Sequence, residues 1–214
     1  MTPGGTASVD NAFFARIWPT VAAHETAAIR ELRRENLAGL SGRVLEVGAG
    51  VGTNFGYYPD SVDQVVAVEP ERRLFARAQA AAAKAPVPVL VTNQTVEEFS
   101  AAEPFDAVVC SLVLCSVRDG DSVLRQIFSK LRPGGELRYL EHVASVGWRG
   151  RLQQVADATL WPRMLGNCHT HRDTEASIRR AGFEIADARR EQTLPRFVPL
   201  PVSELAVGRA YTPA

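Results

Sequence analysis

Short apolar runs alternate along the chain with longer segments in which apolar residues recur at helical spacing. Continuous runs of Val, Leu and Ala predict strands that are buried on both faces, as in a parallel sheet. Because these runs alternate with helices, the pattern predicts an α/β fold, a mainly parallel sheet with helices on both faces. The last two runs follow each other without a long crossover, which favours an antiparallel hairpin. The predicted strands are 44–47, 65–68, 87–92, 104–111, 136–140, 183–190 and 205–211.

Helical periodicity places the helices between these strands. Pro19 should break the first helical segment into two, because proline cannot continue a helix. A turn is expected over 132–135, where Pro and two glycines follow a helix. Thr170 and Asp173 are expected to form the capping box of a helix that stops at Gly182. The predicted helical segments are 11–40, 71–84, 121–131, 148–165 with a break near Pro162, and the segment that stops at Gly182.

The length of 214 residues is enough for one domain with a sizeable core. We expect a flexible tail over 1–10 and a single domain over 11–214, in which 11–40 forms an N-terminal helical cap. Such a cap can lie over the mouth of the sheet, where its aromatic side chains would form a lid.

Three glycines alternate at positions 48, 50 and 52, directly after the apolar run 44–47. A strand that ends in such glycines makes a tight turn, which lets a ligand contact bare backbone. We expect the next helix to start near Thr53 and to point its free N–H groups at that ligand. The dinucleotide fingerprint G-x-G-x-x-G is not matched, because the third glycine comes one residue early and Thr53 fills its place.

Two acidic residues flank the glycine turn. Glu46 lies just before the turn, where a carboxylate suits a ligand with an ammonium group and suits a pyrophosphate badly. Glu69 ends the following apolar run, and a carboxylate at a second strand end can accept both ribose hydroxyls of an adenosine. The residues therefore favour a nucleoside that carries a positive charge.

These sites resemble those of the class I S-adenosylmethionine-dependent methyltransferases. Within them, the segments 108–117, 131–135 and 141–144 look like the methyltransferase-like proteins that methylate thiols and the small bacterial methyltransferases with a type 11 domain. The resemblance implies a Rossmann-like, seven-stranded, mostly parallel sheet with helices on both faces, an antiparallel last strand and an N-terminal helical lid. It also implies S-adenosyl-L-methionine as methyl donor and S-adenosyl-L-homocysteine as product.

The resemblance assigns a set of residues to the donor. Thr95 and Val96 take the places that hold the adenine edge in this fold, and the segment after 104–111 should line the methyl-donor site. The expected donor-binding residues are Glu46, Gly48, Gly50, Gly52, Asn54, Glu69, Pro70, Thr95, Val96, Ser111 and Leu112.

On the acceptor side, His142 follows the fifth predicted strand, at the sheet edge where open α/β sheets bind ligands. We expect it to act as a base or to contact the acceptor; a histidine that only caps a strand end is the alternative. Cys115 is either close to the transferred methyl group or a small buried core thiol. The expected acceptor-binding residues are Phe13, Phe14, Trp18, Cys115 and His142.

The expected function is transfer of a methyl group from S-adenosylmethionine to a small molecule, such as a thiol, a phenol or quinone, an amine or a lipid. Two alternatives stay open. One is an NAD(P)-dependent oxidoreductase, and the other is a protein that binds S-adenosylmethionine without catalysis. The sequence does not name the acceptor atom.

The composition argues against two classes of partner, nucleic acids and the membrane interior. The net charge of zero argues against a nucleic-acid groove. No apolar run approaches membrane-spanning length and no signal-peptide pattern is present, so we expect no integral membrane segment and a cytoplasmic location, as monomer or homodimer.

Three cysteines without a C-x-x-C pair predict neither a disulfide framework nor a zinc ribbon. Cys168, His169 and His171 form a C-H-x-H spacing that matches no common zinc arrangement, so we expect no metal site.

Overall fold

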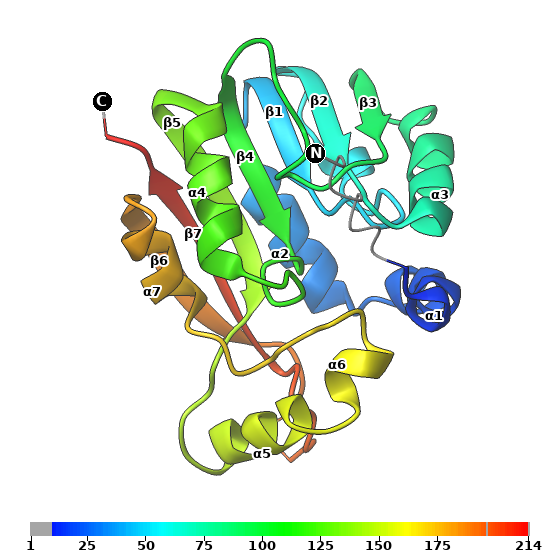
Figure 1. Cartoon of the computed structure of the whole chain (residues 1–214), viewed down its shortest axis with the longest axis vertical. Coiled ribbons are helices and arrows are strands. Elements are labelled where there is room, and N and C mark those ends of the chain that lie inside the picture. The colour runs from blue at the N-terminus through cyan, green and yellow to red at the C-terminus, as the bar shows by residue number, and fades with distance from the viewer. Residues whose placement is uncertain (1–9, 196, 214) are drawn as a thin grey trace, which may run out of the picture.

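The computed structural model describes residues 10–195 and 197–213. It contains one seven-stranded sheet with the strand order β3-β2-β1-β4-β5-β7-β6 (Figure 1). The strands are β1 Gly42–Val47, β2 Val62–Val68, β3 Val89–Thr92, β4 Phe105–Ser111, β5 Leu131–His142, β6 Glu184–Gln192 and β7 Glu204–Tyr211. The helices are α1 Ala12–Ala23, α2 Ala27–Leu37, α3 Arg72–Ala82, α4 Gly120–Lys130, α5 Gly147–Asp157, α6 Trp161–Met164 and α7 Thr174–Arg180, with a 3₁₀ turn η1 at Phe55–Tyr57.

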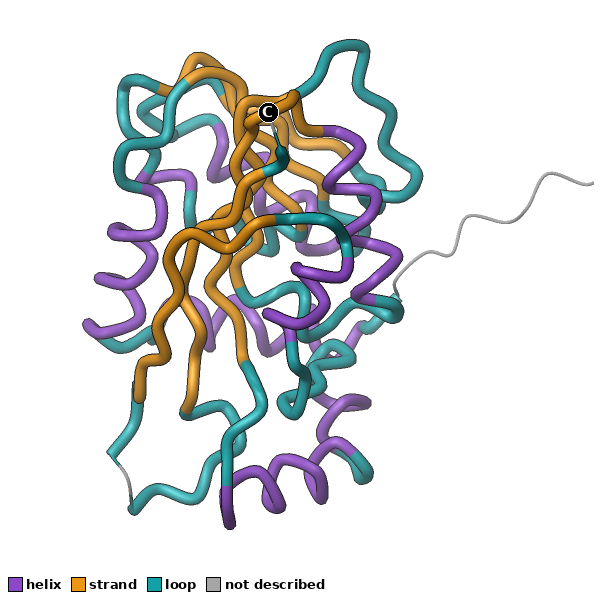
Figure 2. The backbone as a smooth tube through the Cα atoms, turned by 90° about the vertical axis from the view of Figure 1, so that its left-hand side faces the viewer, coloured by secondary structure: helices purple, strands orange, loops and turns teal. Residues whose placement is uncertain are grey.

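The predicted fold class is confirmed. The strands β1 to β5 pair in parallel, and β7 pairs antiparallel with both β5 and β6. Helices cover the sheet on both sides (Figure 2). The division into a tail over 1–10 and one domain over 11–214 stays a prediction, and all of that tail except Asp10 falls outside the described residues.

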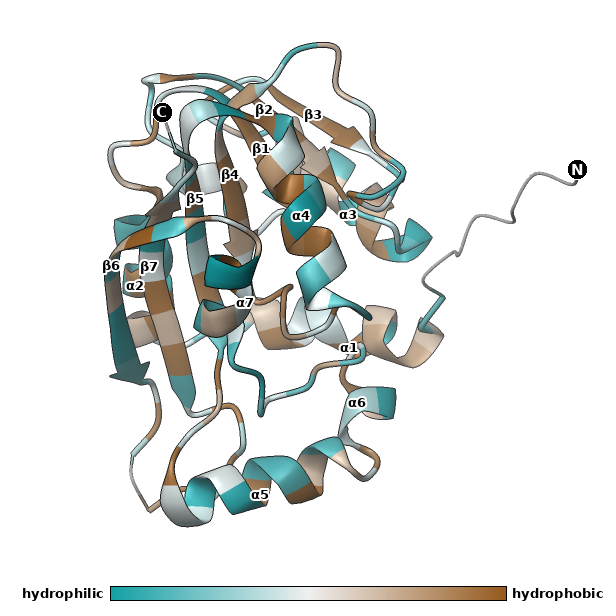
Figure 3. Cartoon of the chain, turned by 60° about the vertical axis from the view of Figure 1, so that its left-hand side comes forward, coloured by the Kyte–Doolittle hydropathy of each residue, from teal (hydrophilic) through white to brown (hydrophobic). Residues whose placement is uncertain are grey.

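Two hydrophobic layers hold the helices to the sheet. One face packs against α4 and α7, where Leu124, Ile127 and Ile178 are buried. The other face packs against α2 and α3, where Leu37 and Ala78 are fully buried. Strands with both faces covered need apolar residues at successive positions, which explains the continuous apolar runs in the sequence. Figure 3 shows the contrast between the hydrophobic central strands and the hydrophilic edge strand β6.

Because parallel strands end at the same edge of a sheet, β1, β2, β4 and β5 bring the segments that follow them together. The helices α1, α5 and α6 lie beyond that edge (Figure 1).

Three local predictions were wrong. Pro19 lies inside α1, and the chain instead breaks at His24, before Thr26 caps α2 by accepting the N–H of Ile29 at 3.3 Å. A helix does not start near Thr53; the glycine turn is followed only by the short η1. The capping box at 170–173 is also absent, because Asp173 itself is the N-cap of α7 and accepts the N–H of Ala176.

The turn expected over 132–135 lies inside the first part of β5. There the register with β4 shifts, and Gly134 has the left-handed φ of 67°. Regular pairing with β4 resumes at Glu136, where the strand was predicted to begin.

Candidate active site

The glycine loop at the carboxyl end of β1 has a backbone that other residues rarely adopt. Gly48, Gly50 and Gly52 have φ of 68°, 59° and 78°. A Cβ on Gly48 would lie 2.3 Å from the side chain of Val113, and one on Gly52 would lie 2.7 Å from Phe55. Glycine is therefore required at these positions both by conformation and by space, and the loop presents bare backbone.

Glu69 directly follows β2 and contacts this loop. Its carboxylate accepts the N–H of Gly50 at 2.7 Å and the N–H of Glu71 at 2.9 Å. The side chain of Asn93 donates to the carbonyl oxygens of Glu69 and Pro70 at 2.8 and 3.0 Å, which fixes the backbone of this turn. Burial raises the pKa of Glu69 to about 7. The acid predicted to grip the ribose thus faces the glycine loop.

Glu46 is buried in β1 and bonded on both oxygens. It accepts the side-chain N–H of Asn54 at 3.0 Å and the hydroxyl of Tyr58 at 2.7 Å. Arg33 from α2 donates to the amide oxygen of Asn54 at 2.9 Å and forms an ion pair with Glu25. Burial raises the pKa of Glu46 to about 7, although Tyr58, Arg33 and Asn54 act in the opposite direction. A ligand ammonium would share the oxygens of Glu46 with these neighbours.

The ends of β1 and β4 are joined through Asn54. Its side-chain N–H groups also donate to the hydroxyl of Ser111 at 3.1 Å. The next residue, Leu112, has a left-handed φ of 59°. A non-glycine residue in this conformation is strained and marks a backbone held by its surroundings. Here its N–H donates to the carbonyl oxygen of Leu140 in β5 at 2.7 Å.

Thr95 and Val96, predicted to hold the adenine edge, follow β3 at the same edge of the sheet. The hydroxyl of Thr95 accepts the N–H of Glu98, whose carboxylate accepts the N–H of Thr95. Val96 is buried in the hydrophobic layer under α4. The backbone of this turn is therefore fixed locally, and its contact with adenine stays a prediction.

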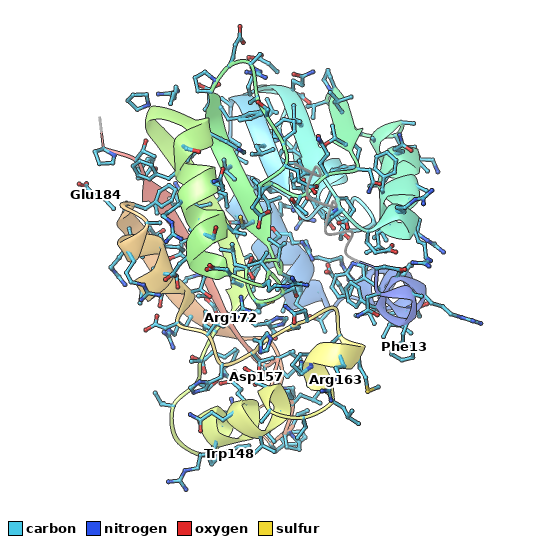
Figure 4. The ribbon with its side chains drawn as sticks, viewed as in Figure 1. Phe13, Trp148, Asp157, Arg163, Arg172 and Glu184 are labelled. Carbon is cyan, nitrogen blue, oxygen red and sulfur yellow. The ribbon has the colours of Figure 1, made fainter. Side chains whose placement is uncertain are left out.

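Two of the three predicted lid residues contact the loops of the site. Phe14 and Trp18 stack at 5.2 Å between ring centroids. A Cβ on Gly50 would lie 3.0 Å from the indole nitrogen of Trp18, and one on Gly166 would lie 3.0 Å from the ring of Phe14. Phe13 is 50% exposed on the outer side of α1 (Figure 4).

The loop after β4 is held by a buried carboxylate. One oxygen of Glu141 accepts the N–H groups of Val113 and Leu114 at 3.0 and 2.9 Å, and the other accepts that of Cys115 at 3.2 Å. Burial raises the pKa of Glu141, and these three bonds lower it again in part. Glu141 positions the loop rather than facing the ligand side.

Cys115, His142 and Cys168 form a cluster at the end of β5. The two Sγ atoms lie 3.7 Å apart, and Nδ1 of His142 lies 3.5 Å from Cys115 and 3.7 Å from Cys168. All three cysteines of the chain are free. The pKa of Cys115 is raised, first by the neighbouring Cys168 and then by burial. The structure thus brings the predicted pair of Cys115 and His142 together and adds Cys168.

Several residues of the site were missed in the sequence. Arg33 and Tyr58 are buried beside Glu46 but were not among the residues predicted for the site, and Cys168 was considered only as part of the C-H-x-H spacing. The place of Glu141 directly after the predicted strand 136–140 indicated a residue that orients backbone, and its bonds to the loop after β4 agree with this. His169 and His171 lie apart from the cluster: His169 contributes its backbone N–H to the carbonyl oxygen of Cys115.

Comparison with protein families gives a match over most of the chain. A family model described as a methyltransferase domain covers residues 21–187. The thiol S-methyltransferase TMT1B of Mus musculus is 34% identical over 82% of this chain and 74% of its own length.

Solved structures agree in fold. The N-methyltransferase NodS from Bradyrhizobium japonicum WM9, in complex with S-adenosyl-L-homocysteine, has a TM-score of 0.69 at 16% identity and covers 96% of this chain and 100% of its own. The [4+2]-cyclase SpnF has a TM-score of 0.71 at 18% identity and covers 99% of this chain and 98% of its own. Within residues 10–195 and 197–213, the helices are all too short or too polar to cross a bilayer.

Proposed function

The chain belongs to the methyltransferase domain family, and from this we propose that it moves the methyl group of S-adenosylmethionine to the sulfur of a small thiol. Methyl transfer from S-adenosylmethionine to a small molecule is the function of the chain. That the acceptor is a thiol is the more specific part of the proposal, and the thiol S-methyltransferases to which the chain is similar support it. A NAD(P)-dependent oxidoreductase finds no support in the family or in these relatives.

One observation carries the donor assignment. Three glycines with left-handed φ follow β1, and the carboxylate of Glu69 at the end of the neighbouring strand contacts the middle one, Gly50. This arrangement fits a nucleoside, because bare backbone lets it approach and a carboxylate accepts its ribose hydroxyls. We assign donor binding to Glu46, Gly48, Gly50, Gly52, Asn54, Glu69, Pro70, Thr95, Val96, Ser111 and Leu112.

The donor, when bound, supplies a sulfonium methyl group that is already reactive toward nucleophiles. The chain has to hold the acceptor in line with that group and to exclude water. Trp18 lies against Gly50 and Phe14 against Gly166, so both aromatic side chains would help to exclude water from the site. His142, with Cys115 beside it, is our assignment for the contact with the acceptor.

A donor and acceptor screen tests the proposal. The purified chain is first titrated with S-adenosylmethionine by calorimetry, and then incubated with labelled donor and a set of small thiols, phenols, quinones and amines. We expect binding of the donor and a labelled thioether product, identified by mass spectrometry. Transfer only to phenols or amines would remove the thiol from the proposal, and absence of donor binding would remove the enzyme. Donor binding without any transfer would favour a non-catalytic binding protein.

We also propose that the protein acts in the cytoplasm as a monomer or homodimer. A reducing compartment suits a chain whose three cysteines are all free, two of them in contact. Fractionation of cells and sedimentation of the purified chain test the two statements.

A further inference from the structure

The cluster of Cys115, His142 and Cys168 has the ligand types and the dimensions of a metal site. The three ligand atoms lie within 4.8 Å of one another. With metal bonds of about 2.3 Å to sulfur and about 2.05 Å to nitrogen, a tetrahedral zinc ion places two sulfurs about 3.8 Å apart and nitrogen about 3.6 Å from sulfur. The corresponding distances are 3.7 Å between the sulfurs, and 3.5 and 3.7 Å from Nδ1 to each. The three ligand atoms are therefore spaced like three corners of such a tetrahedron.

The positions of Cys115 and Cys168 are fixed by contacts between two loops that are far apart in the sequence. The loop 112–117 and the loop 165–172 are joined by hydrogen bonds on both sides of the sulfur pair. The side chain of Asn167 donates to the carbonyl oxygen of Ser116 at 2.7 Å, and the N–H of His169 donates to that of Cys115 at 2.8 Å. The guanidinium of Arg172 donates to the carbonyl oxygen of Leu114 at 2.7 Å. The geometry of the cluster is thus fixed by the backbone rather than by the sulfurs alone.

Two carboxylates support the same arrangement without belonging to it. Glu141 holds the N–H of Cys115, as described above. Asp157 of α5 accepts the N–H groups of Thr170 and His171 at 2.7 and 2.9 Å, and so fixes the loop that carries Cys168 (Figure 4). Groups that orient the ligands of a metal are a regular part of metal sites.

The fourth corner of the tetrahedron is not filled by a side chain of the cluster. Among the described residues, the group consists of these three ligands. The neighbouring carboxylate of Glu141 is occupied by three backbone N–H groups. Both cysteines are buried and His142 is partly exposed, so a fourth ligand would approach from the side of the histidine. Two cysteines, one histidine and an open position form one of the ligand sets of catalytic zinc.

We propose that Cys115, His142 and Cys168 bind one thiophilic divalent cation, with Zn²⁺ as the first candidate, and that its open position takes the sulfur of the acceptor thiol. This inference rests on the proposed function and names how its acceptor is activated. His142 then acts as a ligand of the cation.

The chemistry balances without a further reactant. The acceptor thiol binds the cation and releases its proton to solvent, because a thiol that coordinates such an ion is deprotonated. A lone pair of the bound sulfur forms the new bond to the methyl carbon. The bond between that carbon and the sulfonium sulfur breaks, and its electron pair stays on S-adenosylhomocysteine. The product is a neutral thioether, a weaker ligand than the thiolate, and it leaves the cation.

The place of the cluster is compatible with this transfer. Val113, two residues before Cys115, lies directly against Gly48 of the glycine loop. The strand before it, β4, pairs with β1, which carries the glycine loop, and with β5, which ends in His142. The cation and the proposed donor loop therefore share one edge of the sheet.

Cobalt substitution tests the site directly. The chain is reduced, freed of metal with dipicolinate and titrated with Co²⁺, which shows thiolate charge-transfer and d–d bands in a tetrahedral sulfur site. We expect one equivalent to bind, and the bands to shift when 2-mercaptoethanol is added. Each of Cys115→Ser, His142→Ala and Cys168→Ser should weaken Co²⁺ binding by about 100-fold or more.

Two matched variants serve as controls. Cys110→Ala removes a buried cysteine of β4 outside the cluster, and His169→Gln changes the histidine next to Cys168. Both should retain the cobalt bands and the methyl transfer. Calorimetry with S-adenosylmethionine confirms that each ligand variant is folded; for a variant that is not, chelation of the wild-type chain gives the same comparison.

The outcomes separate the two proposals. Absence of the bands, their survival in all three ligand variants, or no shift with 2-mercaptoethanol would overturn the cation site. Thiol methylation that continues unchanged after chelation would also overturn it, and would leave the proposed function standing. Bands that shift with the thiol in a chain that transfers no methyl group would support the site and contradict the proposed function.

Discussion

Glu46 and Glu69 are two buried carboxylates whose pKa values of about 7 lie well above the usual 4.5. At pH values between 4.5 and about 7, the folded chain therefore binds more protons than the unfolded chain. The free energy of unfolding of the ligand-free protein therefore falls as the pH rises through this window. A shift of this size corresponds to about 3 kcal/mol for each group at most.

We predict that urea unfolding at a series of pH values shows this loss between pH 4.5 and 7, and that Glu46→Gln makes the profile flatter. The exposed Glu97→Gln serves as control and should leave the profile as it is. A stability that rises over the same window in the wild type would contradict the assignment. Donor affinity should increase with pH over the same window, because in our proposal the ionised forms of both carboxylates bind the donor.

Glu69→Ala tests the grip on the ribose. The change removes the acceptor of the Gly50 N–H and the proposed acceptor of the sugar hydroxyls, so donor binding should weaken by about 1–3 kcal/mol. Calorimetry with S-adenosylmethionine measures this, with Glu97→Ala as the exposed counterpart. Equal affinities in the wild type and in Glu69→Ala would show that Glu69 does not hold the donor.

The loop 112–117 is an element whose shape depends on Glu141. In Glu141→Gln the amide nitrogen would face the N–H of either Cys115 or the pair Val113 and Leu114, so at least one buried donor loses its partner. We predict a loss of about 1–3 kcal/mol in the free energy of unfolding. Methyl transfer should fall while the affinity for S-adenosylmethionine stays unchanged. Glu184→Gln, an exposed residue at the start of β6, is the control, and a donor affinity that falls with the activity would refute this separation.

The elements that could be predicted from the sequence are those with a local signal. Continuous apolar runs marked the strands, and alternating glycines followed by Glu69 marked the loop and its acid. The helix expected at Thr53 failed because the tight turns of the loop continue directly into η1. The break predicted at Pro19 was wrong because α1 continues through the proline to Ala23. The backbone hydrogen bond that proline cannot donate costs less than the remaining contacts of the helix provide.

The cluster of Cys115, His142 and Cys168 could not be predicted from spacing. Cys115 and Cys168 are 53 residues apart, and their contact depends on how the loop after α6 crosses the end of β4. The C-H-x-H spacing matched no zinc arrangement; its first residue, Cys168, belongs to the cluster, whereas His169 and His171 do not. Contacts of this kind are tertiary, so a sequence pattern of one element does not contain them.

The whole molecule should be stabilised by its donor. A ligand that binds only the folded chain adds about 2.7 kcal/mol at a concentration of 100 times its Kd. For a chain of 214 residues, this predicts a rise in Tm of about 5–10 °C with S-adenosylmethionine or S-adenosylhomocysteine. NAD and NADP should cause no rise. A thermal shift with the nicotinamide cofactors alone would contradict the methyltransferase assignment.

The two contacts of α1 connect the halves of the site. Trp18 lies on the glycine loop, and Phe14, stacked on it, lies on Gly166, two residues before Cys168. Whatever displaces this helix to admit one substrate also uncovers the place of the other. Once the helix has moved, either substrate can therefore enter first, and initial-rate patterns with the demethylated donor as inhibitor should show a random rather than a compulsory order of binding.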